Sequence, residues 1–277
     1  MRLTERDKQA IEAVYRYRVL TQVQLEHLVF PGCHPSVAQR RLLLLYQHGY
    51  LSRQFLPVRG GILTSPILYI LDQKGADVLK AEHADSAIHW TRAHHAAKSL
   101  FYAHMLALND VRIALTVACR VRGYRIVTWT GEREMKNGYD FVIAETPAGR
   151  AERMPVLPDS YFAFVAPHTD AKQAAHFFVE LDRGTETTKR FCRKIRAYIA
   201  YVKSGGYTTR YGTKSLRVLT VTTGARRLKS LKTATERVGG HSRFWFTTLD
   251  TLSSATALTD PIWYVAGRPE PCSLVSC

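Results

Sequence analysis

The sequence predicts an α/β (α+β) protein in which two folded domains follow one another. Three observations support this: three short helical patterns and a pair of extended segments fill residues 5–71, helices and strands alternate in the order α-β-β-β-α-β over residues 94–221, and a polar, histidine-rich stretch separates the two regions. The chain has 277 residues and is 46% hydrophobic, which is enough apolar material to bury a substantial core. We expect one domain over residues 1–90, a second over 91–250, and a C-terminal tail over 251–277.

Composition excludes several classes of protein. No run approaches the roughly 18 uninterrupted apolar residues of a membrane helix, and the first residues, MRLTERDKQ, lack the apolar stretch of a secretory signal. The cysteines are odd in number, scattered and without a C-x-x-C pair, which argues against a disulfide framework and a cysteine zinc site. We therefore expect a cytoplasmic protein that does not enter the membrane. The cysteines are Cys33, Cys119, Cys192, Cys272 and Cys277.

The charge is strongly positive and unevenly distributed. The chain has 39 Lys and Arg against 23 Asp and Glu, a net charge of +16. Residues 1–90 contribute +3 (11 basic, 8 acidic) and residues 91–277 contribute +13 (28 basic, 15 acidic), with 14 basic residues and one acidic residue between Arg183 and Lys232. Such a density favours binding to a phosphate backbone, the alternative being a solvated basic face.

The first helical patterns have recognisable ends. Thr4 can cap the first helix, Thr21 can cap the second, Pro31-Gly32 ends the second, and Gly49 closes the third. After Gly49 the pattern becomes extended and is interrupted by Arg59-Gly60-Gly61, as in a hairpin with a glycine-rich tip. The expected helices cover residues 5–18, 21–29 and 37–48, and the expected strands cover residues 50–55 and 67–71.

Three helices followed by a hairpin are typical of a winged helix-turn-helix domain. In that arrangement the third helix lies in the major groove of DNA, where its exposed face would present Gln39, Arg40, Gln47 and His48. Arg53 and Arg59 on the hairpin could reach phosphates. The alternative is a domain that docks only protein partners, because a net charge of +3 gives weak support for tight DNA binding by this domain alone.

The second region contains a long helix and several buried strands. No proline or glycine interrupts residues 94–122, and their apolar positions follow a helical period, so Gly123 is expected to end a long helix. Aromatic and β-branched runs mark the strands, two of which should be hairpin neighbours. The strands are expected over residues 124–129, 154–165, 176–182, 216–221 and 244–246, and two further helices over residues 187–203 and 225–237.

Three acidic residues lie inside otherwise apolar strands. Burying an unpaired carboxylate costs several kcal/mol, so Asp159, Glu180 and Asp182 require an explanation. Glu180 and Asp182 are two residues apart and project from one face of their strand, and Asp159 can converge on the same edge from the neighbouring strand. Together they predict an oxygen-ligand site for Mg²⁺ or Mn²⁺, an ion that could activate water for phosphodiester cleavage.

Pro158-Asp159, followed 21 residues later by Glu180-Leu181-Asp182 on this core, resembles the PD-(D/E)xK nuclease superfamily. With the preceding helices and the stretch FFVELDRGTETTKRFCRKIRAYIAYV, nearly the whole chain resembles the replication-relaxation family of plasmid and mobile-element proteins. The resemblance implies a restriction-endonuclease-like second domain, binding at a replication or transfer origin, and nicking as an additional activity. It matches Asp159 and Glu180 to metal-binding carboxylates.

The sequence departs from the nuclease pattern at one position. The lysine expected two residues after Glu180 is Asp182, and Lys194 on the following helix is the candidate replacement. In the alternative reading, the acidic residues pair with Arg183 or Arg190 in a nuclease fold that is retained only for DNA binding and needs no metal.

The expected function is therefore DNA binding in plasmid or mobile-element replication or transfer, with metal-dependent nicking by Asp159, Glu180, Asp182 and Lys194 as a further step. The competing class is a non-enzymatic transcriptional regulator with a degenerate nuclease fold. Double-stranded DNA is the expected partner, and replication or transfer proteins and a second copy of the chain are candidate partners. The second domain should grip DNA through Lys189, Arg193, Arg226, Arg227, Lys229 and Lys232.

Overall fold

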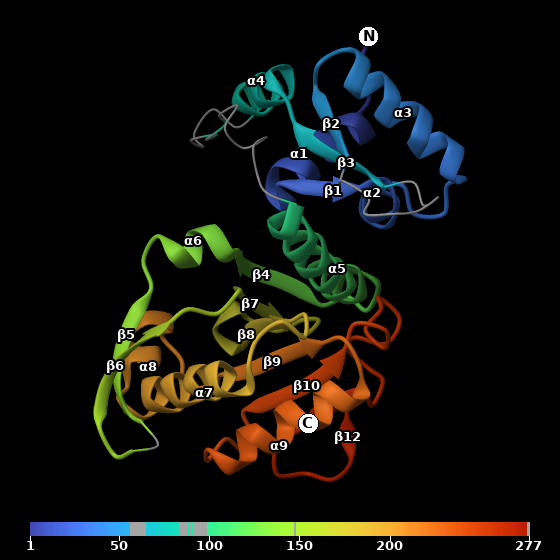
Figure 1. The fold of residues 1–277 in the computed structure, drawn as a ribbon. Helices are drawn as coiled ribbons and strands as arrows, with labels where there is room; N and C mark the ends of the chain where they lie inside the picture. Colours follow the sequence, from blue (N-terminus) through green and yellow to red (C-terminus); the bar gives the residue numbers. More distant parts are fainter. Residues whose placement is uncertain (56–64, 83–87, 89, 91–98, 147, 276–277) are drawn as a thin grey trace. The chain divides into compact units, whose positions relative to one another are not determined.

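A computed structural model describes residues 1–55, 65–82, 88, 90, 99–146 and 148–275 (Figure 1). The chain combines helices with multi-stranded sheets, as the sequence predicts, and forms two compact units over Met1–Ile113 and Ala114–Cys277. The boundary was expected after residue 90. The first unit continues to Ile113 because the first half of the long helix α5 (Ser99–Val121) packs on its sheet.

The first unit has the expected three helices followed by a hairpin, with helix ends within two residues of those predicted. Thr4 and Thr21 each form a capping box with the residue three positions later. A short first strand, which the sequence analysis did not predict, joins the hairpin to give a sheet of order β1-β3-β2. The elements are α1 (Glu5–Tyr17), β1 (Val19–Thr21), α2 (Gln22–Val29), α3 (Pro35–Gln47), β2 (Leu51–Phe55), β3 (Ile67–Leu71) and α4 (Gln73–Glu82).

Polar contacts fasten the first half of α5 to the first unit. The side-chain amide of Asn109 donates to the carbonyl oxygen of Val19 at 2.7 Å and to that of Tyr17 at 3.2 Å. Gln24 donates to the carboxylate of Asp110 at 2.6 Å. The buried bonds from Asn109 satisfy backbone carbonyls at the start of β1, so this part of α5 is integral to the first unit.

The second unit is built on a seven-stranded sheet of order β12-β11-β10-β9-β8-β7-β4. Strands β8, β9 and β10 run parallel, and all other neighbours in this sheet are antiparallel. The elements after α5 are β4 (Arg125–Thr130), α6 (Glu132–Lys136), β5 (Asp140–Glu145), β6 (Ala151–Val156), β7 (Ser160–Val165), the 3-10 helix η2 (Ala171–Gln173), β8 (Ala175–Asp182), α7 (Thr188–Lys203), α8 (Gly206–Tyr211), β9 (Arg217–Thr222), α9 (Ala225–Arg237), β10 (Phe244–Thr248), β11 (Trp263–Val265) and β12 (Pro271–Cys272).

The predicted α-β-β-β-α-β order is present as α5, β4, β7, β8, α7 and β9, with a hairpin inserted between β4 and β7. The single strand expected over residues 154–165 is two strands, because the chain turns at Leu157-Pro158. Its first half, β6, pairs with β5 in a separate two-stranded sheet. Its second half, β7, is the antiparallel neighbour of β8, as expected.

The expectation of a C-terminal tail over residues 251–277 is corrected by the structure. β11 pairs antiparallel with β10, and β12 pairs with β11, so this segment extends the main sheet. Trp263 of β11 is fully buried and donates through its indole nitrogen to the carbonyl oxygen of Ala257 at 2.9 Å. Burial of an indole with its N–H satisfied is a strong anchor for such a segment.

Helices α7 and α9 connect the parallel strands and cover one face of the sheet (Figure 1). Phe191 and Ile195 of α7 and Leu231 of α9 pack in one core with sheet residues that include Phe178 and Phe246. Each β-α-β crossover returns the chain to a parallel strand. The carboxyl ends of β8 and β9 therefore lie side by side at one edge of the sheet, under the first turns of these helices.

Candidate functional site

Strand β8 carries two acidic residues at its carboxyl end. Side chains alternate between the faces of a strand, so Glu180 and Asp182 share the face of Phe178, which is the face covered by α7. In the parallel register Glu180 lies opposite Thr220 and Asp182 lies opposite Thr222 of β9. The predicted common face of the two carboxylates is present in the structure.

Glu180 is almost completely buried, with 2% of its surface exposed. Nζ of Lys194 donates to its Oε2 at 2.8 Å, and the hydroxyl of Tyr198 donates to its Oε1. Burial raises the pKa of Glu180 to about 7, and the positive charge of Lys194 opposes that rise. The carboxylate is thus held in a pocket that satisfies both of its oxygens.

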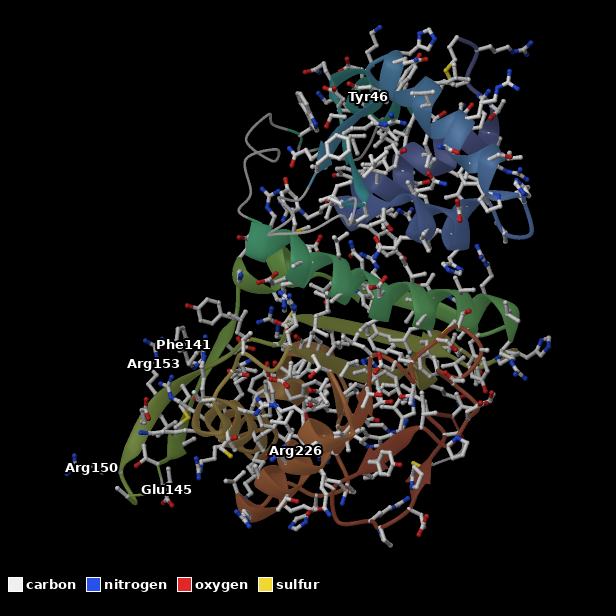
Figure 2. The ribbon with its side chains drawn as sticks, turned by 45° about the vertical axis from the view of Figure 1, so that its right-hand side comes forward. Tyr46, Phe141, Glu145, Arg150, Arg153 and Arg226 are labelled. Atoms are coloured by element: carbon white, nitrogen blue, oxygen red, sulfur yellow. The ribbon has the colours of Figure 1, made fainter. Side chains whose placement is uncertain are left out.

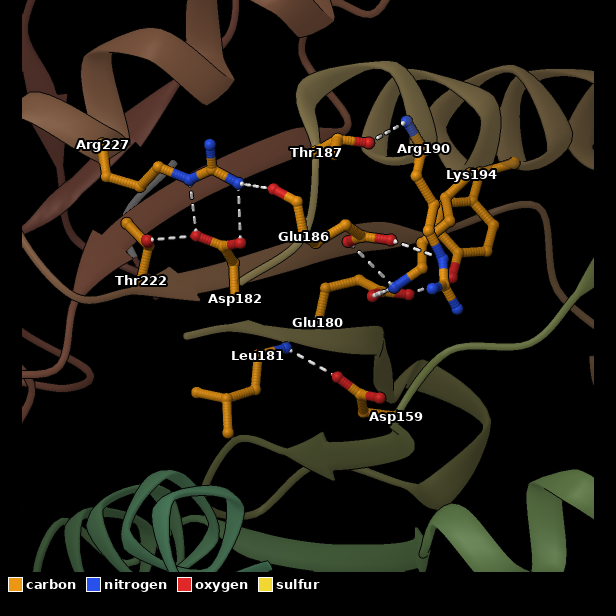
Figure 3. Close-up of polar contacts among 11 residues, drawn as sticks. Asp159, Glu180, Leu181, Asp182, Glu186, Thr187, Arg190, Lys194, Thr222 and Arg227 are labelled. Atoms are coloured by element: carbon orange, nitrogen blue, oxygen red, sulfur yellow. Dashed lines mark hydrogen bonds and ion pairs between the residues drawn. The ribbon is translucent and has the colours of Figure 1, made fainter. Parts of the chain in front are cut away.

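Lys194 contacts two acidic side chains. Besides Glu180, it lies 3.3 Å from Oε2 of Glu186 (Figure 3). Burial alone would lower the pKa of the Lys194 amine, but the charges of Glu180 and Asp159 outweigh burial and raise it above its usual value. The side chain is therefore a cation at neutral pH.

Asp159 precedes β7 and is fastened to β8 through the backbone. Its amide donates to the carbonyl oxygen of Val179 at 3.0 Å, and its Oδ2 accepts the amide of Leu181 at 2.8 Å (Figure 3). Its charge contributes to the pKa values of both Glu180 and Lys194. The structure thus brings together Asp159, Glu180 and Lys194, which sequence analysis assigned to one site.

Asp182 is held in a separate ion pair. Arg227 of α9 donates to its two oxygens at 2.8 and 2.9 Å, and the hydroxyl of Thr222 donates at 2.7 Å. Burial alone would raise the pKa of Asp182, but these bonds outweigh it and hold the pKa below the usual range. Nη2 of Arg227, which donates to Oδ1 of Asp182, also donates to the carbonyl oxygen of Glu186 at 2.6 Å (Figure 3).

The sequence analysis considered Arg183 or Arg190 as partners for the acidic cluster. Arg190 instead lies 3.3 Å from the carboxylate of Glu186, and Arg227 is the partner of Asp182. Sequence reasoning missed the structural roles of Arg227, Thr222 and Glu186. Thr222 follows from the parallel register of β8 and β9, which no local pattern in the sequence displays.

The predicted three-carboxylate metal site does not fit the observed arrangement. Within the described ranges, no group of three or more His, Cys, Asp or Glu side chains is placed to hold a metal ion. Both oxygens of Asp182 are bonded to Arg227, and both oxygens of Glu180 are bonded to Lys194 and Tyr198. A Mg²⁺ or Mn²⁺ ion held by these carboxylates would compete with the positive charges of Arg227 and Lys194 for the same oxygens.

On the first unit, α3 presents a broad exposed face. Ala38, Leu42 and Leu45 are buried, whereas Gln39 and Arg40 are exposed, as the sequence predicts. The residue after Arg40 has a structural role. Nε of Arg41 donates at 2.9 Å to the buried carboxylate of Asp7, which lies three residues after the cap of α1, and a second nitrogen of Arg41 donates to the other oxygen. This pair fixes the rotation of α3 against α1.

Arg53 of β2 lies between two aromatic rings. Its guanidinium carbon is 4.8 Å from the ring centre of Tyr46 on α3 and 5.3 Å from that of Tyr69 on β3. It also donates to the hydroxyl of Tyr69 at 3.2 Å. Stacking of this kind holds a guanidinium in one orientation, next to the exposed face of α3. Arg59, the other predicted phosphate contact of the hairpin, lies outside the described residues.

The predicted DNA-binding cations of the second unit divide into two groups. Arg193 pairs with Glu152, Lys232 lies 2.7 Å from Glu236, and Arg227 binds Asp182. Lys189, Arg226 and Lys229 are exposed and form no ion pair with any described residue. Arg226, labelled in Figure 2, also lines a cavity of about 470 Å³ at the start of α9, together with Thr223, Gly224, Ala225, Arg227 and Ser230.

A family model described as replication-relaxation matches residues 11–216 of the chain. The match covers more than half of the sequence and includes α3, β8 and α7. No match was found among curated proteins or among solved structures. In the part of the chain that the structure describes, every helix is too short or too polar to cross a membrane.

Proposed function

The chain belongs to the replication-relaxation family, and from this premise we propose that it binds duplex DNA at an origin-like site, reading bases with α3 and holding phosphates with α7 and α9. Family membership gives the protein a role in plasmid or mobile-element replication or relaxation and implies an interaction with DNA. The proposal adds that α3 contacts the major groove and names the residues that contact DNA. It also assigns base recognition to the first unit and phosphate binding to the second.

The exposed face of α3 carries this proposal. The first unit has the three helices and hairpin of a winged helix-turn-helix, the arrangement in which the third helix enters the major groove. The Asp7–Arg41 pair and the buried residues of α3 hold that helix down, which leaves Gln39 and Arg40 turned outward. Glutamine and arginine are the side chains that make paired hydrogen bonds to adenine and guanine.

The second unit supports the proposal through its unpaired cations. Lys189 on α7 and Arg226 and Lys229 on α9 belong to helices that pack against each other on one face of the sheet. Exposed cations without an acidic partner are available for phosphates, and each phosphate they neutralise releases a counterion from DNA. We expect this surface to supply affinity without sequence preference.

Binding-site selection from a random duplex library tests the reading of bases by α3. The parent protein should select a defined motif, and Arg40→Ala should relax it at one or two positions while nonspecific affinity is nearly kept, a loss of about 1–3 kcal/mol of discrimination. Lys80→Ala, at an exposed lysine on α4, is the matched control and should select the parent motif. If Arg40→Ala also selects the parent motif, α3 does not read bases through this residue.

Nicking is the second candidate function, and one observation favours it. Lys194 Nζ lies 2.8 Å from Glu180, beside Asp159, so an amine from α7 occupies the neighbourhood that the nuclease pattern assigns to a lysine two residues after the acid. Because cations of α7 and α9 already bind the oxygens of Glu180 and Asp182, DNA binding without cleavage is the function we favour. The alternative regulator of transcription would bind an operator through the same α3 face.

A supercoiled plasmid carrying the selected motif, incubated with Mg²⁺ or with Mn²⁺, separates these candidates. We expect intact plasmid with the parent protein. Open circles that disappear in Asp159→Asn and Glu180→Gln, and persist in the exposed control Asp170→Asn, would overturn this expectation and establish nicking. Each variant is first checked for parent-like circular dichroism and for binding to the motif.

A further inference from the structure

An exposed leucine lies at the centre of the face that α3 turns outward. We propose that Leu43 recognises the methyl group of a thymine in the major groove, and so specifies a T·A pair within the DNA site. This inference rests on the proposed function, since it names one base-pair feature that the α3 face reads.

The position of Leu43 follows from helix geometry. At roughly 100° per residue, the buried residues Ala38, Leu42 and Leu45 define one side of α3. Leu43 lies three residues after Arg40 and four residues before Gln47, which places all three side chains on the opposite side. A helix that enters the groove with Arg40 in contact with bases therefore brings Leu43 to the same groove floor.

Leu43 differs in exposure from two neighbouring leucines of α3, and Val37 and Tyr46 are further exposed apolar residues of this helix. Leu43 is 37% exposed, whereas Leu42 and Leu45 on either side of it are completely buried. A single exposed leucine carries little information by itself. Here it is bordered by arginine and glutamine, which are the residues of base recognition, on a helix fixed by the Asp7–Arg41 pair.

The chemistry of the major groove identifies the group that Leu43 would contact. Among the base edges of the major groove, the C5-methyl of thymine is the apolar feature, and apolar side chains contact it. A protein partner would bury a larger apolar surface and would not require the neighbouring Arg40. The family's link to DNA favours a nucleic acid at this face.

Replacement of thymine by deoxyuridine removes only the methyl group and tests the contact directly. In the selected motif, each thymine is replaced singly and binding is followed by fluorescence anisotropy. At one or two positions the parent protein should bind the uracil duplex about fourfold more weakly, the effect of one buried methyl group. Leu43→Ala should bind the thymine and uracil duplexes equally, at the weaker level.

Two further variants make the result specific. Leu43→Met keeps an apolar side chain of similar reach and should retain the preference for thymine at the same position. Val37→Ala removes another exposed apolar residue of α3, which is 42% exposed and lies about 120° around the helix from Leu43, and this variant should leave the preference unchanged. Only variants whose helical content, measured by circular dichroism, equals that of the parent protein are compared.

The outcomes distinguish this inference from the proposed function. If no uracil substitution weakens the parent, or if Leu43→Ala keeps the full preference for thymine, Leu43 does not read a methyl group, although Arg40→Ala can still relax the motif. If the parent selects no motif at all, the proposed reading of bases by α3 fails together with this inference.

Discussion

Nζ of Lys194 lies 2.8 Å from Oε2 of Glu180, and the two residues are 14 positions apart in the chain. The amine reaches the carboxylate because α7 begins soon after β8 and packs on the face from which Glu180 projects. The position two residues after Glu180 is occupied by Asp182, which is bound to Arg227. Two ion pairs therefore lie next to each other at the end of β8, one facing α7 and the other facing α9.

Replacing Lys194 should destabilise the second unit. Lys194→Met leaves the buried Glu180 without its positive partner, and we expect a loss of about 2 kcal/mol in the free energy of unfolding, typical of an unsatisfied hydrogen bond to a charged group. The pKa of Glu180 should rise further. Urea unfolding measures the loss, and the double variant Lys194→Met/Glu180→Gln should recover most of it. A double variant no more stable than Lys194→Met would contradict the pairing.

Truncation of the adjacent residues Arg226 and Arg227 should affect stability very differently. Arg227→Ala removes the partner of buried Asp182 and should cost about 3 kcal/mol of stability, the lower end for a broken buried ion pair. Arg226→Ala changes an exposed side chain and should stay within about 0.5 kcal/mol of the parent. Thermal unfolding and DNA binding are measured on both variants. Equal stabilities would mean that the Arg227–Asp182 pair does not hold α9 in place.

The salt dependence of DNA binding should identify the cations that contact phosphates. For the triple variant of Lys189, Arg226 and Lys229 to alanine, the slope of log K against log salt should become shallower by up to about 0.9 per residue. Arg193→Ala/Lys232→Ala, which removes two cations that already have acidic partners, should change the slope less. A parent-like slope in the triple variant would show that these three residues do not contact phosphate.

Acid should weaken the first unit through the Asp7–Arg41 pair. Burial alone would raise the pKa of Asp7, but bonds from Arg41 and from the backbone of Thr4 lower it below its usual 3.8. The unfolded chain therefore takes up the proton first as the pH falls, so the stability from this pair is complete above about pH 4 and is lost through the lower folded pKa.

The comparison with Asp7→Asn measures this effect. Above pH 4 the parent should melt at a higher temperature than the variant, and the difference should shrink progressively below pH 4. A difference that is constant down to pH 2 would mean that ionisation of Asp7 contributes no stability.

Where local signals were strong, the sequence was sufficient to predict the elements. Helix α9 covers Ala225–Arg237 as expected, and Thr4 and Thr21 cap their helices as expected. The run Leu42–Leu45 shows the limit of periodicity, because four consecutive leucines occupy every side of a helix. Only packing against α2 and β2 decides that Leu42 and Leu45 are buried and that Leu43 is exposed.

The acidic residues of the candidate site could be predicted from the sequence, whereas most of the residues that bind them could not. The two-residue spacing on β8 placed Glu180 and Asp182 on one face without further information. Arg227 lies 45 positions after Asp182, and the pair forms only after two β-α-β crossovers have aligned β8, β9 and α9. The β5–β6 hairpin and the strands β11 and β12 were also missed, since short strands depend on pairing more than on their own composition.

The strands beyond residue 250 cover the edge of β10. All five residues of β10 are buried, and β11 occupies the hydrogen-bonding edge that β10 would otherwise present to solvent. A chain shortened to residues 1–250 would carry that apolar edge bare, and unpaired edges of this kind recruit strands from other molecules. We therefore expect such a truncation to yield aggregated protein, so variants intended for solution work should retain the strands β11 and β12.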